Sequence, residues 1–105
     1  MSQTVDQARI FEWLYAAVDE VNRQLRKAQR IDKSPDTLLT GEGGVLDSLG
    51  MLNLLVAIER RIEQHSGLIV TLADEESLSQ DPSPFRSLSS LAEHIQRVVD
   101  RKQPA

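Results

Sequence analysis

The sequence predicts an all-α protein, a bundle of three main helices and one short helix. Three long segments place apolar residues at helical spacing, and each begins at a residue that commonly caps a helix. Stretches that contain Pro or Gly separate these segments. The length of 105 residues and the hydrophobic content of 40% are those of one small domain. We therefore expect a single domain over residues 1–105.

The first helix is expected over residues 4–29. Thr4, followed three residues later by Gln7, forms a capping box, which is typical of a helix start. The apolar positions that follow at helical spacing are Phe11, Leu14, Tyr15, Val18, Val21 and Leu25.

The first segment also contains a tryptophan outside the apolar stripe and a cluster of four bases. Trp13 lies off the apolar stripe, so it either packs along a helix edge or serves as an interface anchor. Four bases follow near the expected helix end, where they would complement the negative pole of the helix rather than form a binding patch. These bases are Arg23, Arg26, Lys27 and Arg30.

The middle of the chain is expected to form a loop, a second helix and a connector. Residues 31–46 contain Pro, Ser, Asp and several glycines, a composition typical of a loop. The second helix is expected over 48–65, with Gly67 as its stop. The apolar run Leu68–Leu72 has no partner strand, so we expect a buried connector.

The last third of the chain is expected to hold a short helix and a long one. Asp74 is placed to cap a short helix over 75–79, which the following prolines would break. Ser87 is the expected N-cap of a helix over 88–100, and Phe85 is expected to plug the core in front of it. The inner stripe of this helix would be Leu88, Leu91, Ile95 and Val98.

The net charge of −4 is unevenly distributed along the chain. Residues 32–81 hold ten acids and three bases, whereas the two flanks together hold six acids and nine bases. This negative field argues against a nucleic-acid partner and favours docking to a basic protein surface. The alternative is an ordinary solvated acidic surface.

The sequence contains no cysteine, so disulfides and thiol chemistry are excluded. No apolar run approaches the roughly 18 residues that a membrane span requires. The first residues also lack the basic start and apolar core of a signal peptide. We therefore expect a cytoplasmic protein with no membrane span.

Ser48 lies where the glycine-rich loop meets the second helix. A serine at a helix start is commonly only a cap. Here Asp47 is the better cap, so Ser48 would occupy the first helical position with a free hydroxyl. A phosphodiester at that position would face unpaired N–H groups and the positive end of the helix dipole.

Catalysis by Ser48 itself is not expected. The hydrolase nucleophile elbow requires Gly-x-Ser-x-Gly after a strand, whereas Leu46 replaces the first glycine here. His65 lies seventeen residues further along the same helix, about 25 Å at 1.5 Å per residue. The only other histidine is His94, and the histidines and carboxylates lack metal-ligand spacing. We expect no catalytic residues, no metal site and no enzyme activity.

The expected second helix carries two apolar faces. Its core face would be Met51, Leu54, Leu55, Ile58 and Ile62. A second stripe of Leu49, Leu52 and Val56 lies roughly opposite, bordered by Asn53, Glu59, Arg60 and Glu63. Such a helix is either buried on all sides or presents one face to a partner. The charged border favours a partner, because protein interfaces commonly have an apolar centre and a polar rim.

The segment Gly44–Ile62, GVLDSLGMLNLLVAIERRI, resembles the modification segment of acyl carrier proteins. The resemblance implies an acyl-carrier-like four-helix bundle and a 4′-phosphopantetheine arm on Ser48. It also implies that a phosphopantetheinyl transferase reads Asp47 and Leu49. The family's partner-recognition positions on this helix correspond to Leu49, Leu52, Val56 and Glu59, and Arg60 adjoins them.

The chain departs from fatty-acid carriers in the charge of this helix. Those proteins usually carry an acid where Gly50 stands, and often acids at the positions of Asn53, Arg60 and Arg61. A strongly basic docking patch would lose attraction here. We therefore expect a discrete carrier for a specialised pathway rather than the housekeeping fatty-acid carrier.

The expected function is to hold an acyl or aminoacyl group as a thioester on the Ser48 arm. Its expected partners are the transferase, an acyl- or aminoacyl-loading ligase and downstream biosynthetic enzymes, and we expect a monomer. The alternative is an unmodified interaction module that binds a partner helix or groove through Leu49, Leu52 and Val56.

Overall fold

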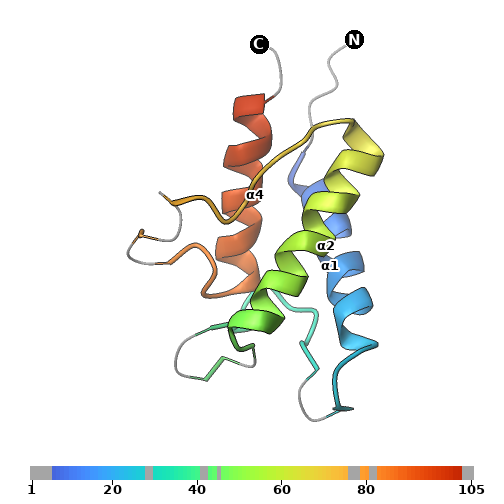
Figure 1. Ribbon diagram of the computed structural model, residues 1–105, viewed down its shortest axis with the longest axis vertical. Helices are drawn as coiled ribbons and strands as arrows, with labels where there is room; N and C mark the ends of the chain where they lie inside the picture. The colour runs from blue at the N-terminus through green and yellow to red at the C-terminus, as the bar shows by residue number, and fades with distance from the viewer. Residues whose placement is uncertain are drawn as a thin grey trace.

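The computed structural model describes residues 6–27, 30–40, 43–44, 46–75, 79–80 and 83–102. Over these ranges the protein is all-helical, as the sequence predicts, and the described residues form three helices and no strand. The helices are α1 (Gln7–Asn22), α2 (Ser48–Ser66) and α4 (Leu88–Lys102). Figure 1 shows that α1 runs in the opposite direction to both α2 and α4. The predicted Thr4 cap and residues 76–78 of the predicted short helix lie outside the described residues.

Helix α1 begins at an aspartate cap, because Asp6 Oδ1 accepts the N–H of Arg9 at 2.9 Å. It ends at Asn22, so the predicted end at residue 29 is wrong. The Asn22 side chain donates to the carbonyl of Ile31 at 2.9 Å and accepts from its N–H at 2.8 Å. These two bonds fold the chain back and bury Ile31, which a longer helix would have carried away.

Trp13 is part of the core, with 6% of its surface exposed. Its ring stacks on His65 near the end of α2, with the ring centroids 6.2 Å apart. The tryptophan therefore packs along the edge of α1 against α2, and its interpretation as an interface anchor is wrong.

Helix α2 begins where the sequence predicts and ends at Ser66, one residue beyond the predicted end. Asp47 is its N-cap, and Gly67 follows its last residue with a φ of 77°. That left-handed conformation suits glycine, which has no Cβ to clash with the backbone. The predicted core face is buried in full, at Met51, Leu54, Leu55, Ile58 and Ile62.

The start of α4 is surrounded by the loop that precedes α2. Ser87 Oγ accepts the N–H of Ser90, which confirms the predicted cap. The N–H groups of Leu88 and Ser89 donate to the carbonyls of Thr37 and Pro35 at 3.0 and 2.8 Å. The loop thus satisfies backbone groups that a helix start otherwise leaves without partners. The predicted inner stripe and Phe85 are buried: Leu88, Leu91, Ile95, Val98 and Phe85.

The connector after α2 links α2 to α4 (Figure 1). Val70 and Leu72 are buried, as predicted for this run, whereas Ile69 is 72% exposed. The Leu72 N–H donates to Glu59 Oε2 of α2, and its carbonyl accepts from His94 Nε2 of α4, both at 2.8 Å. One peptide segment is therefore held from both sides, between two helices that each pack on α1.

Candidate functional site

The start of α2 is fixed by its aspartate cap. Asp47 Oδ1 accepts the N–H of Gly50 at 2.7 Å, and the Asp47 carbonyl accepts the N–H of Met51 at 2.9 Å. Ser48 is the first residue of the helix, as the sequence predicts. Its side chain lies outside the described part of the structure.

Gly50 lies directly under this cap. A Cβ at this position would stand 3.1 Å from the Leu46 side chain and 3.2 Å from Asp47 Oδ1. Both contacts are tighter than most contacts of a real Cβ. The glycine therefore lets Leu46 and the cap carboxylate close over the first turn.

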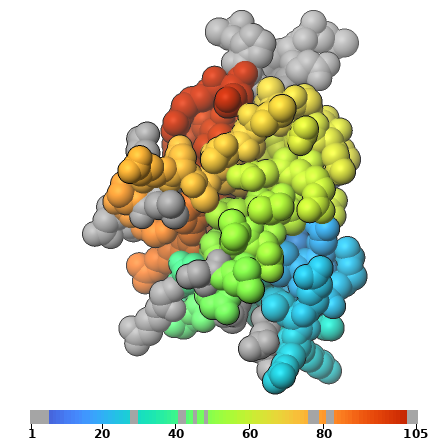
Figure 2. All heavy atoms as spheres, in the orientation of Figure 1, coloured from blue at the N-terminus to red at the C-terminus, as the bar shows by residue number. Residues whose placement is uncertain are grey.

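The second apolar stripe of α2 is exposed. Leu49, Leu52 and Val56 leave 66%, 53% and 43% of their surfaces open to solvent. Figure 2 shows α2, in green to yellow, uncovered along the face of the molecule that is drawn. The alternative of a helix buried on all sides is therefore wrong. Three large apolar side chains on one exposed face are the composition expected of a contact surface.

Two of the three charged residues that were expected to border this stripe, Glu59 and Arg60, contact other parts of the chain. Glu59 accepts the Leu72 N–H, so its carboxylate holds the connector. Arg60 and Arg61 both approach Glu20 of α1, at 3.2 and 3.8 Å. One carboxylate thus offsets part of the charge of two guanidinium groups. The exposed stripe is bordered less by free charge than the sequence suggests.

Both histidines have structural contacts. His65 stacks on Trp13. His94 is buried, donates from Nε2 to Leu72 and meets Phe85 edge-on, with ring centroids 5.5 Å apart. Because the partner of Nε2 is a carbonyl oxygen, this nitrogen carries the proton. No group of three His, Asp or Glu residues within the described residues is arranged to hold a metal ion.

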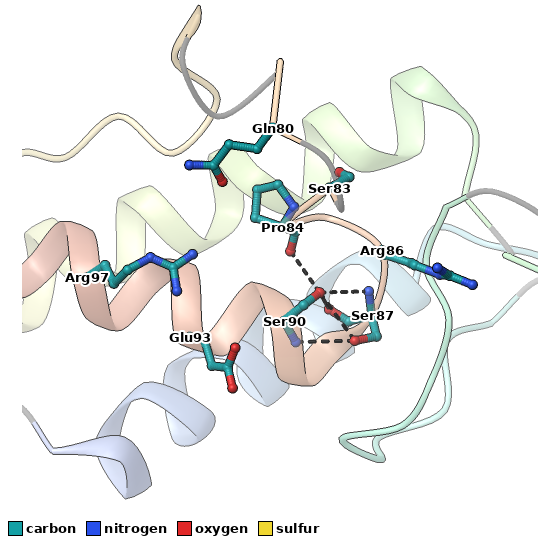
Figure 3. Close-up of a pocket in the computed structure, with 8 residues that line it drawn as sticks. All are labelled: Gln80, Ser83, Pro84, Arg86, Ser87, Ser90, Glu93 and Arg97. Atoms are coloured by element: carbon teal, nitrogen blue, oxygen red, sulfur yellow. Dashed lines mark hydrogen bonds between the residues drawn. The ribbon is translucent and has the colours of Figure 1, made fainter.

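A hollow of about 290 Å³ lies beside the start of α4 (Figure 3). Ser87 and Ser90 border it, and both hydroxyls take part in the helix cap. Ser90 Oγ also donates to the Pro84 carbonyl at 2.9 Å. The Ser87 and Ser90 hydroxyls are therefore used by the cap, and Arg86, Glu93 and Arg97 line the hollow with charges of both signs.

The sequence did not reveal the role of Glu59 or of the loop around α4. The Glu59 bond spans thirteen residues to Leu72, and no local pattern encodes such a contact. Pro35 and Thr37 reach α4 across about fifty residues of chain, which is equally invisible to periodicity.

Comparisons with known proteins add no relative. No known protein family, curated protein or solved structure matches the chain. No helix in the described part of the chain is both long and apolar enough to cross a membrane.

Proposed function

We propose that this protein is a discrete carrier that holds an acyl or aminoacyl intermediate on a 4′-phosphopantetheine arm at Ser48. The observation that carries the proposal is the exposed start of α2. There Asp47 caps the helix, Ser48 occupies its first position and the stripe of Leu49, Leu52 and Val56 begins one residue later. The resemblance of Gly44–Ile62 to the modification segment of acyl carrier proteins supports it.

The residues at this start fit a phosphodiester. Helix N-termini favour phosphate, because their first N–H groups and the helix dipole present positive charge. Leu49 is 66% exposed, so the first turn is open to an approaching enzyme. When attached, the arm supplies a terminal thiol that holds the acyl or aminoacyl group as a thioester. Asp47 and Leu49 are the residues that the transferase reads.

In this proposal the short helix over 75–79 completes an acyl-carrier-like four-helix bundle. The carrier performs no bond chemistry of its own and acts as a monomer in the cytoplasm. A loading ligase and the downstream enzymes of a specialised pathway dock on Leu49, Leu52 and Val56, with Glu59 and Arg60 at the edge. Tethering raises the effective concentration of the intermediate at each docked enzyme.

The low free charge along α2 supports a specialised partner. Asn53 and Leu52 are exposed, and Arg60 and Arg61 are partly offset by Glu20. A partner on this face therefore meets an apolar stripe rather than an acidic helix. Apolar contact at the centre with few free charges favours shape over electrostatic attraction as the basis of selection.

The test is the intact mass of the protein before and after incubation with coenzyme A, Mg²⁺ and a broad-specificity phosphopantetheinyl transferase. We expect a gain of one phosphopantetheine, absent in Ser48→Ala. Ser89→Ala is the matched control, because Ser89 lies in the first turn of α4, and it should retain the gain. No gain in the unaltered protein with several transferases would reject the carrier.

A second candidate is an unmodified interaction module. The observation in its favour is the exposed stripe, which would bind a partner helix or groove without any arm. Ser48→Ala separates the two functions, since it would abolish the carrier and leave a binding module intact. Leu52→Asp should disable both.

A further inference from the structure

Because α1 ends earlier than predicted, four basic residues lie in the loop after it rather than in its last turns. Arg23, Arg26, Lys27 and Arg30, here called the basic loop, were expected to complement the end of a longer helix. Helix α1 ends at Asn22, and its last turn contains no basic residue. All four side chains are exposed, and only Arg23 is the C-cap of α1.

The charge of the basic loop is not neutralised by ion pairs. None of its four cations pairs with another described residue. The acids near the end of α1 serve other cations: Asp19 pairs with Lys33 at 3.1 Å, and Glu20 with Arg60 at 3.2 Å. Residues 23–30 contain no acid, and the next one along the chain is the exposed Asp32. A local positive surface therefore stands on a chain whose net charge is −4.

The basic loop is anchored rather than loosely tethered. The two hydrogen bonds between Asn22 and Ile31 fasten its ends together. Leu25 packs against the core from inside it. Arg23 and Arg30 border one hollow of about 390 Å³, together with Asp19 and Asn22. The segment that carries the cations is thus fixed at its base, which lowers the ordering cost of docking.

The basic loop lies at the same end of the molecule as the start of α2. In Figure 1 the chain that follows α1, in light blue to cyan, and the start of α2, in green, are both at the lower end. A partner that engages the start of α2 therefore approaches the end that also carries the basic loop.

We propose that the basic loop is a docking surface for an acidic patch on a partner protein. Nucleic acid and anionic membranes fit less well, because both continue their negative charge well beyond the loop, where the acid-rich segment 32–81, including the exposed Asp47 at the same end, would repel it. A protein surface can place acids opposite the loop and apolar groups opposite α2. Resting on the proposed function, the partner is an enzyme whose entrance for the arm is flanked by acids.

The test uses a fluorescently labelled decaglutamate peptide as the probe of the full chain at low salt. Binding is followed by fluorescence anisotropy. The triple variant Arg23→Glu, Arg26→Glu and Lys27→Glu should weaken binding at least tenfold. The matched control reverses three exposed bases on α4, Arg97→Glu, Arg101→Glu and Lys102→Glu, with the same change in net charge. It should weaken binding less than threefold.

The proposal is overturned by an equal loss in both triple variants, or by no loss in the loop variant. It is also overturned if a ten-nucleotide single strand of DNA binds more tightly than the peptide in the same buffer. Trp13 fluorescence and circular dichroism verify that both variants fold. If the loop variant fails to fold, the milder Arg26→Gln with Lys27→Gln replaces it, and an affinity equal to that of the unaltered protein overturns the proposal.

A measurement on the same preparations separates this proposal from the carrier function. The mass gain with coenzyme A and transferase is taken at its end point for each variant. Absence of peptide binding with a full mass gain rejects only the docking surface. Specific peptide binding without any mass gain in the unaltered protein rejects only the carrier.

Discussion

The starts of α2 and α4 have similar local sequences and opposite surroundings. Each helix begins at a short polar cap, Asp47 for α2 and Ser87 for α4, and each places a leucine in its first turn. At α4 loop carbonyls accept from the first N–H groups, and Leu88 is fully buried. At α2 the next leucine, Leu49, is 66% exposed. The difference shows that a helix start becomes a candidate site only where the chain does not cover it.

The largest expected effect on stability comes from truncating these two leucines to alanine, one at a time. Leu88→Ala should lower the free energy of unfolding by about 2–5 kcal/mol, because it leaves a cavity in the core. Leu49→Ala should change it by no more than about 0.5 kcal/mol, as for other surface substitutions. Urea unfolding followed by circular dichroism measures both. Comparable losses would mean that the start of α2 is covered in solution.

A pair of glycine substitutions tests the surroundings of each start. A Cβ at Gly44 would stand 2.7 Å from the backbone of Thr40, in the loop that precedes α2 and surrounds the start of α4. Gly44→Ala should therefore cost about 1–3 kcal/mol, the usual range for overpacking.

Gly50→Ala is the control for that substitution. Its nearest contact is the flexible end of Leu46 at 3.1 Å, and alanine is favoured over glycine inside a helix by about 1 kcal/mol. The two effects offset each other, so we expect a change within about 1 kcal/mol by thermal or urea unfolding. A loss at Gly50 that exceeds the loss at Gly44 would contradict the comparison.

The smallest expected effects are those of the two caps. Asp47→Ala and Ser87→Ala each remove one acceptor for a first-turn N–H and should each cost about 1 kcal/mol. Asp47→Asn and Ser87→Thr should recover most of the loss, because both side chains still cap. Hydrogen exchange of the Gly50 and Ser90 amides would show whether each loss arises at its own helix start, and unchanged exchange at either amide would argue against the cap.

The sequence predicted the local features of the fold and missed the long-range ones. Asp47, Gly67 and Ser87 act within a few residues of themselves, and the two faces of α2 follow from helical spacing alone. The end of α1 depends on Ile31, which lies nine residues beyond Asn22. The burial of Trp13 depends on His65, far along the chain. Such contacts exist only once the helices are packed.

For the candidate site, too, the sequence predicted the local features and missed the long-range contacts. Exposure of the stripe that begins at Leu49 followed from its place opposite the core face. The engagement of Glu59 with Leu72 and of Arg60 with Glu20 did not, because both partners belong to other segments. Glu59 and Arg60, which the sequence suggests as a free charged border of the stripe, are therefore partly engaged in contacts within the protein.

The paired hydrogen bonds between Asn22 and Ile31 also separate the basic loop from the rest of the architecture. They close the segment at its base, so its exposed positions can change in charge while Leu25 keeps its contact with the core. The segment then behaves as an exchangeable cassette. Grafting a loop of different charge between these two residues would offer a way to redirect the protein toward another partner without redesigning a helix.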